Sequence, residues 1–258
     1  MDERFAPAEG PSCGPEGCEA PSGGQSAVLD APARAASRVD VVSDAICPWC
    51  WVGKRNLEGA LDILAREDGE RFEVHWRPFQ LNPDMPREGV ERAAYRAAKF
   101  GSLERSRALD AQVAEAGAAA GVAFRHERML RTPNTVDAHR LIRLAGEAGP
   151  VVQNRVVESL FRAYFHDGRD IGDRAVLAAV AGEAGMDAEA VARSLAGAEG
   201  EAEVREEDAG FRRLGLSGVP TFALQGHVLF SGAMPPATMA DAFRKALAVL
   251  RERGLMAA

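Results

Sequence analysis

Residues 47–50 read C-P-W-C and follow closely on the apolar segment V-D-V-V at residues 39–42. A strand that ends in C-x-x-C and opens a helix is the typical layout of a thiol–disulfide exchange site. The chain contains four cysteines, and two of them lie at this one strand–helix junction. The motif therefore predicts electron transfer between thiols, with a strand before the cysteines and a helix after them.

The predicted helix assigns different roles to the two cysteines. Pro48 suits its first turn, because the missing N–H would have no partner there. Cys47 should then occupy the N-cap, where free N–H groups and the positive end of the helix dipole favour a thiolate. Cys50, one turn further in, is placed to attack a mixed disulfide formed at Cys47. We expect Cys47 to be the nucleophile and Cys50 the resolving thiol, with Pro48 and Trp49 as candidate substrate contacts.

Composition narrows the choice of partners and location. The net charge of −7 and the lack of a basic block argue against a nucleic-acid partner. No segment approaches the ~18 consecutive apolar residues of a membrane span.

The N-terminal residues lack the pattern of a secretory signal, so the expected location is cytoplasmic. In a reducing compartment, paired cysteines are more often catalytic or metal-binding than structural. The exchange chemistry itself calls for no dissociable cofactor.

The order of predicted elements indicates one α/β unit with a helical insertion. Residues 1–38, rich in Pro, Gly, Ser and Ala, are expected to form a disordered tail. The sheet-forming unit is assigned to residues 39–86 and 215–256, and four to six helices are predicted in the insertion at 87–214. Gln225-Gly226 predicts a tight hairpin.

Two further interpretations concern the helical insertion and its end. The five histidines form no ligand pattern and are expected to be surface or core residues; His139, on a helix expected to face the sheet, is also a candidate for lining the active-site cleft. The acidic run at residues 199–208 is typical of a solvated helix face.

Cys13 and Cys18 form a second pair within the predicted tail. The intervening G-P-E-G favours a turn that a disulfide or a metal ion could close. A flexible linker of about 20 residues has a root-mean-square reach of roughly 25 Å, enough to bring this pair to Cys47. Exchange with the active-site pair, or its regulation, is one hypothesis; the other is a tail whose thiols do little.

A structural zinc site made of all four cysteines is a competing interpretation. It is disfavoured because a zinc knuckle does not usually need Pro-Trp inside the pair, or a strand before it and a long helix after it.

Taken together, these motifs resemble the DsbA-type thioredoxin fold and, within it, the FrnE-like oxidoreductase branch. The resemblance covers about residues 38–253 and is carried by several separate stretches of sequence. These are Ser43-Asp44, residues 47–53 (C-P-W-C-W-V-G), 76–83 (W-R-P-F-Q-L-N-P), 132–135 (T-P-N-T) before His139, 218–221 (G-V-P-T) and 231–233 (S-G-A).

This resemblance implies a thioredoxin-like core interrupted by a large helical insertion. It also implies that Pro220 is cis and faces the cysteines, and that the backbone of Val219 binds an extended substrate. The implied partner is a thiol- or disulfide-containing protein, or a small thiol such as glutathione, with the chain as monomer or homodimer. A sister branch of glutathione-dependent isomerases and transferases shares the architecture but typically carries Ser in place of Cys47 and lacks the second thiol.

Overall fold

The computed structural model describes residues 36–256. Its main sheet has four strands in the order β2-β1-β5-β6. Strand β1 pairs in parallel with β2 and antiparallel with β5, and β5 pairs antiparallel with β6. The sheet and the two helices that complete it are β1 (Ser37–Ser43), α1 (Pro48–Asp68), β2 (Phe72–Pro78), β5 (Thr221–Leu224), β6 (His227–Ser231) and α9 (Pro236–Glu252).

The segment between β2 and β5 is mainly helical. Its elements are β3 (Val90–Glu91), α2 (Arg92–Phe100), α3 (Leu103–Ala119), η1 (His126–Arg128), β4 (Arg131–Thr132), α4 (Val136–Glu147), α5 (Pro150–Phe165), α6 (Arg174–Glu183), α7 (Ala188–Ala196) and α8 (Glu201–Arg213). All of this segment is described, and it holds seven α-helices where four to six were predicted. It also contains the short antiparallel pair β3–β4, so the insertion is not purely helical.

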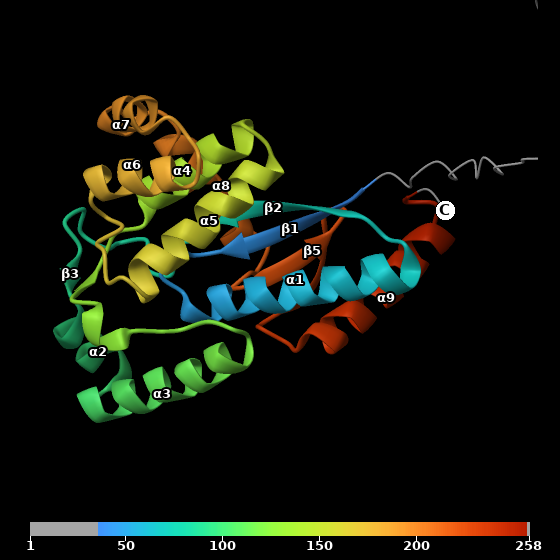
Figure 1. The fold of residues 1–258 in the computed structure, drawn as a ribbon, viewed down its shortest axis with the longest axis horizontal. Coiled ribbons are helices and arrows are strands. Elements are labelled where there is room, and N and C mark those ends of the chain that lie inside the picture. The colour runs from blue at the N-terminus through green and yellow to red at the C-terminus, as the bar shows by residue number, and fades with distance from the viewer. Residues whose placement is uncertain (1–35, 257–258) are drawn as a thin grey trace, which may run out of the picture. The chain divides into compact units, whose positions relative to one another are not determined.

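Helices α1 and α9 run side by side along one face of the sheet (Figure 1). On α9 the Phe243 ring contacts Phe72 of β2 and Phe230 of β6, with ring centroids 5.9 and 6.0 Å apart. Alternate β1 residues, Val39 and Val41, are fully buried. This is the pattern of a strand with one face on an apolar core, so burial of these side chains fixes the strand's orientation.

The opposite face of β1 and β2 carries charged side chains and is met by α8. Arg77 of β2 donates to Asp40 of β1 at 2.8 Å and pairs with Glu207 of α8 at 3.0 Å. Asp208 is buried and accepts the backbone N–H of Gln80 at 3.1 Å. The prediction that the acidic run is a solvated helix face is confirmed for Glu203 and Glu206, which are exposed. It is wrong for Glu207 and Asp208, because their carboxylates hold α8 against the sheet and the loop after β2.

Two turns in the core depend on residues with a positive φ angle, one at the end of α1 and one between β5 and β6. Helix α1 ends at Gly69, whose φ of 66° is the left-handed conformation that glycine adopts without a Cβ clash. The β5–β6 hairpin turns at Gln225 and Gly226, with φ of 50° and 80°. Two successive positive φ angles match the right-handed twist of the strands, so the predicted hairpin is confirmed.

Candidate active site

The C-P-W-C motif lies at the junction of β1 and α1, as the sequence predicts. Cys47 is the N-cap residue and Pro48 begins the helix. The backbone N–H of Cys47 donates to the Asp44 carbonyl at 3.0 Å, and that of Cys50 donates to the Cys47 carbonyl at 3.0 Å. These bonds close one turn between β1 and the helix. They place Cys47 at the N-cap and Cys50 within the first turn of α1.

The two thiols differ in their surroundings. Cys47 retains 5% of its accessible surface and lines a cavity, whereas Cys50 is fully buried. With both cysteines as free thiols, burial raises the pKa of Cys50 well above its ordinary value, and the hydrogen bond and charge of Cys47 raise it further. A buried thiol without a compensating cation holds its proton. Cys47 is thus the sulfur that a molecule in the cavity can reach.

The loop before β5 meets the motif. The Val219–Pro220 peptide bond is cis, as the resemblance implies. The Cys47 thiol donates a hydrogen bond to the Val219 carbonyl oxygen, with Sγ 3.6 Å from the oxygen. Pro220 contacts α1 at Gly53, where a methyl group would lie 2.8 Å from the proline Cγ. Residues more than 160 positions apart in sequence therefore form one small surface around the Cys47 sulfur.

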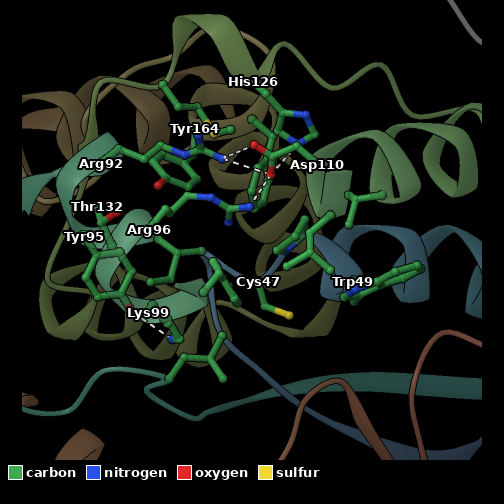
Figure 2. Close-up of a pocket in the computed structure, with 18 of the residues that line it drawn as sticks. Cys47, Trp49, Arg92, Tyr95, Arg96, Lys99, Asp110, His126, Thr132 and Tyr164 are labelled. Atoms are coloured by element: carbon green, nitrogen blue, oxygen red, sulfur yellow. Dashed lines mark hydrogen bonds and ion pairs between the residues drawn. The ribbon is translucent and has the colours of Figure 1, made fainter. Parts of the chain in front are cut away.

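A cavity of about 380 Å³ opens beside Cys47. Figure 2 shows that α2 lines one side of it with Arg92, Tyr95, Arg96 and Lys99. Besides Cys47, the other labelled residues are Trp49, Asp110, His126, Thr132 and Tyr164. None of the α2 or α3 side chains was predicted to belong to the site. The signal available in the sequence was the spacing of Arg92, Arg96 and Lys99, which places three cations on one face of a helix.

The two tryptophans near the motif have separate environments. Trp49, between the cysteines, is 39% exposed and lines the cavity. Trp51 is buried and packs on Phe124, Phe161 and Phe165, with centroid distances of 5.3 to 6.3 Å. Only Trp49 is therefore placed to touch a bound molecule.

His139 does not line the cavity and is instead a core histidine, the other of the two positions expected for it. It is buried on α4, where its Nε2 lies 3.5 Å from Oδ1 of the fully buried Asp44. The other Asp44 oxygen accepts the backbone N–H of Leu81 at 2.7 Å. The pair joins the turn before the cysteines to α4 and to the loop after β2. Its position follows from packing, because the histidine points toward the turn and away from the cavity.

The second cysteine pair, Cys13 and Cys18, lies outside the described residues. Two of the four ligands of the hypothetical zinc site therefore lie outside the described residues as well. Within residues 36–256, no group of three or more His, Cys, Asp or Glu side chains is placed to hold a metal ion.

A β-α-β unit, a hairpin and a final helix, with C-x-x-C at a helix N-terminus facing a cis-proline loop, define the thioredoxin-fold class of dithiol proteins. The profile of the DSBA-like thioredoxin domain matches residues 38–244. The chain belongs to this family, and it is a thiol–disulfide oxidoreductase of the DsbA type.

Solved structures give the same result for the fold. A probable DsbA oxidoreductase from Streptomyces coelicolor is 34% identical, with 82% of this chain and 90% of that one covered and a TM-score of 0.73. The cytosolic disulfide reductase DsbM from Pseudomonas aeruginosa, solved with GSH, is 21% identical over 83% and 99% of the two chains, with a TM-score of 0.53. A 2-hydroxychromene-2-carboxylate isomerase is 16% identical over 85% and 100%, with a TM-score of 0.60.

In the part of the chain that the structure describes, every helix is too short or too polar to cross a membrane.

Proposed function

We propose that this protein exchanges thiols and disulfides through Cys47 and Cys50, with Cys47 as the attacking sulfur and Cys50 as the resolving one. The observation that carries the proposal is the contrast between the two sulfurs. Cys47 lies at the N-cap of α1, hydrogen-bonded to the Val219 carbonyl and lining the cavity. Cys50, one helical turn further along, is fully buried.

The reaction follows from this arrangement. The Cys47 thiolate attacks a substrate disulfide, the S–S bond breaks, and one substrate thiolate leaves and takes up a proton. Cys50 gives up its proton and attacks the Cys47 sulfur of the mixed disulfide, which releases the second substrate thiolate. Two electrons pass from the dithiol to the substrate. The same steps in reverse oxidise a substrate dithiol.

We assign substrate contacts to four residues around Cys47. Pro48 and Trp49 line the cavity beside the sulfur, and Val219 offers its carbonyl and N–H to an extended chain. Pro220 supports that segment against α1. The partner is a thiol- or disulfide-containing protein or a small thiol such as glutathione, the ligand named for DsbM. We also propose that the chain belongs to the FrnE-like branch, on the sequence motifs given above, and that it acts in the cytoplasm, as the name of the cytosolic reductase DsbM suggests by analogy.

The proposal is tested by measuring the reduction potential of the pair in glutathione buffers, with thiols counted by mass spectrometry. The wild type should show a reversible two-electron transition between roughly −120 and −270 mV, the range of working exchange proteins. Cys50→Ser should accumulate a mixed disulfide on Cys47, and Cys47→Ser should form none. If the wild type shows no reversible transition, the proposal is wrong.

The same variants separate a second candidate, a glutathione-dependent isomerase or transferase. Its support is the shared fold and an enclosed cavity beside one sulfur. Such an enzyme would keep its activity in Cys50→Ser, because its chemistry does not need a second thiol on the protein. An exchange enzyme would lose turnover in that variant.

We extend the proposal to the tail, where Cys13 and Cys18 would exchange with the active-site pair. The double variant Cys13→Ser/Cys18→Ser should shift the measured potential or slow turnover with a protein disulfide. If potential, turnover and metal content all stay at their wild-type values, the tail pair has no part in the reaction. Stoichiometric zinc in freshly purified protein, lost together with the fold on chelation, would instead favour the four-cysteine metal site.

A further inference from the structure

The cavity beside Cys47 is electropositive in a protein whose net charge is −7. Its lining includes three cations, Arg92, Arg96 and Lys99, and one carboxylate, Asp110. Burial lowers the pKa of His126, the remaining titratable base of the lining, so it adds no positive charge at neutral pH. The wall therefore carries an excess of two positive charges close to the sulfur that reacts.

These three cations are not equally paired. Arg92 and Arg96 share Asp110, with N–O distances of 3.1 and 2.6 Å. Lys99 has only neutral oxygens near its ammonium group: Asn82 Oδ1 at 3.1 Å and the Tyr95 hydroxyl at 2.7 Å. Within residues 36–256, no carboxylate lies within ion-pairing distance of Lys99. The Tyr95 hydroxyl also donates to Asn82 Oδ1. Lys99, Tyr95 and Asn82 therefore form a polar cluster at the cavity whose positive charge no carboxylate of the described residues neutralises.

The size of the cavity selects a small ligand. About 380 Å³ is within the range of small-molecule sites and is enclosed partly by Trp49, Phe100 and Phe165. Figure 2 shows Lys99 and Tyr95 on one side of Cys47 and Trp49 on the other. A molecule whose sulfur is bonded to Cys47 would extend along these apolar walls toward the ammonium group.

We propose that this cavity selects small disulfides that carry a carboxylate, with Lys99, Tyr95 and Asn82 receiving that carboxylate while Cys47 forms the mixed disulfide. The inference rests on the proposed exchange reaction and adds the charge of its substrate. Lys99 is a specificity-determining residue in this scheme. The bonds, electrons and protons exchanged are those of the reaction given under the proposed function, because the substrate carboxylate takes no part in the bond changes.

The test uses three symmetrical disulfides of similar length and different charge: 3,3′-dithiodipropionate (anionic), 2-hydroxyethyl disulfide (neutral) and cystamine (cationic). Stopped-flow tryptophan fluorescence would give the rate of oxidation of the fully reduced protein by each. The wild type should react faster with the anionic disulfide than with the neutral one, once both are corrected for their reactivity with free cysteine. Cystamine should be slowest on the same scale.

Lys99→Gln should lower the ratio of the anionic to the neutral rate roughly three- to fivefold, the effect of one exposed charge pair. Lys99→Glu should lower it further and raise the relative rate of cystamine. Lys99→Arg should restore most of the ratio, because it restores the charge. The matched control is Lys245→Gln, an exposed lysine on α9 that does not line the cavity. It should leave all three rates as in the wild type.

Equal corrected rates for the three disulfides in the wild type would overturn the inference, and so would a ratio that Lys99→Gln does not change. Both results leave the exchange reaction intact, because the pair is still oxidised by every disulfide. Failure of the wild type to react with any of the three would remove the exchange reaction itself, and the inference with it.

Discussion

Gly53 on α1 and Pro220 in the loop before β5 are in contact at a position where no side chain fits. A Cβ at residue 53 would lie 2.8 Å from the Pro220 Cγ and 3.4 Å from the Phe222 Cζ. The helix that carries both cysteines is therefore packed directly on the loop whose carbonyl accepts the Cys47 thiol. The absence of a side chain at one residue sets the distance between the sulfur and that loop.

Gly53→Ala should therefore damage both stability and exchange. The added methyl must displace a proline ring in a packed core, which costs about 1–3 kcal/mol of unfolding free energy. Thermal or urea unfolding measures this, and the exchange rate should fall with it. The control is Gly210→Ala in α8, where the nearest atom is an arginine terminus at 3.7 Å. That helical substitution should stabilise the protein by about 0.4–1 kcal/mol. Equal effects in the two variants would contradict the packing argument.

The raised pKa of Cys50 makes the stability of the reduced protein depend on pH. An unfolded cysteine ionises near pH 8.5, so above that pH the unfolded chain loses a proton that the folded chain keeps. The contribution is complete below about pH 8.5 and falls as the pH rises, by at most about 1.4 kcal/mol per unit. Urea unfolding at pH 7.5 and 9.5 under a phosphine reductant should show this fall, and Cys50→Ala should show a smaller one. Identical pH dependence in both proteins would be the contrary result.

Asp44 should be required for the turn that precedes the cysteines. Its carboxylate accepts the Leu81 N–H at 2.7 Å from a fully buried position. Asp44→Ala leaves that buried donor unsatisfied and should lower the unfolding free energy by about 1–3 kcal/mol. Asp44→Asn keeps an acceptor oxygen and should cost less. Chemical denaturation compares the two. An asparagine variant that loses as much as the alanine variant would show that the carboxylate beside His139 matters more than the hydrogen bond to Leu81.

Glu158 of α5 should make the polar interactions that contribute most to holding α1 against α5. Its carboxylate accepts the Trp51 indole N–H at 3.2 Å and pairs with Arg55 and with Lys54, whose side chain is 2% exposed. Glu158→Ala should lower the unfolding free energy by about 1–3 kcal/mol, because it removes a partner from a buried ammonium and an indole. Glu58 pairs with the same two cations from within α1 and is more exposed. Glu58→Ala should therefore cost less; an equal or larger cost would refute this role for Glu158.

Local chemistry made the core of the fold predictable. The N-cap position of Cys47, the start of α1 at Pro48 and the hairpin at Gln225-Gly226 depend on residues close together in sequence. The cap of α7 depends on the same kind of local chemistry, because the Asp187 carboxylate accepts the backbone N–H groups of Glu189 and Ala190. These features follow from backbone conformation and hydrogen bonding, which a few neighbouring residues determine.

The cavity could not be predicted in the same way, because it is made by tertiary packing. Arg92 and Lys99 line the same cavity as Cys47 only because α2 and α3 fold back beside the start of α1 (Figure 1). Their sequence pattern is equally compatible with a solvated helix. The seventh helix was missed because breaks such as Gly101-Ser102, where α2 ends and α3 is capped, are short. His139 could not be assigned to the core or the cavity in advance, because helical spacing fixes the face of a residue but not the neighbour that covers it.

The complete burial of Cys50 has a consequence for oxidative damage. Peroxide that entered the cavity would meet the Cys47 sulfur and oxidise it to a sulfenic acid, which further peroxide would carry to irreversible acids. Cys50 lies within the same turn of helix, protected from solvent and still carrying its proton. Its attack on the sulfenic acid forms the Cys47–Cys50 disulfide and releases water. The arrangement that hides one sulfur from substrates thus also keeps a reserve thiol with which the exposed sulfur can be recovered.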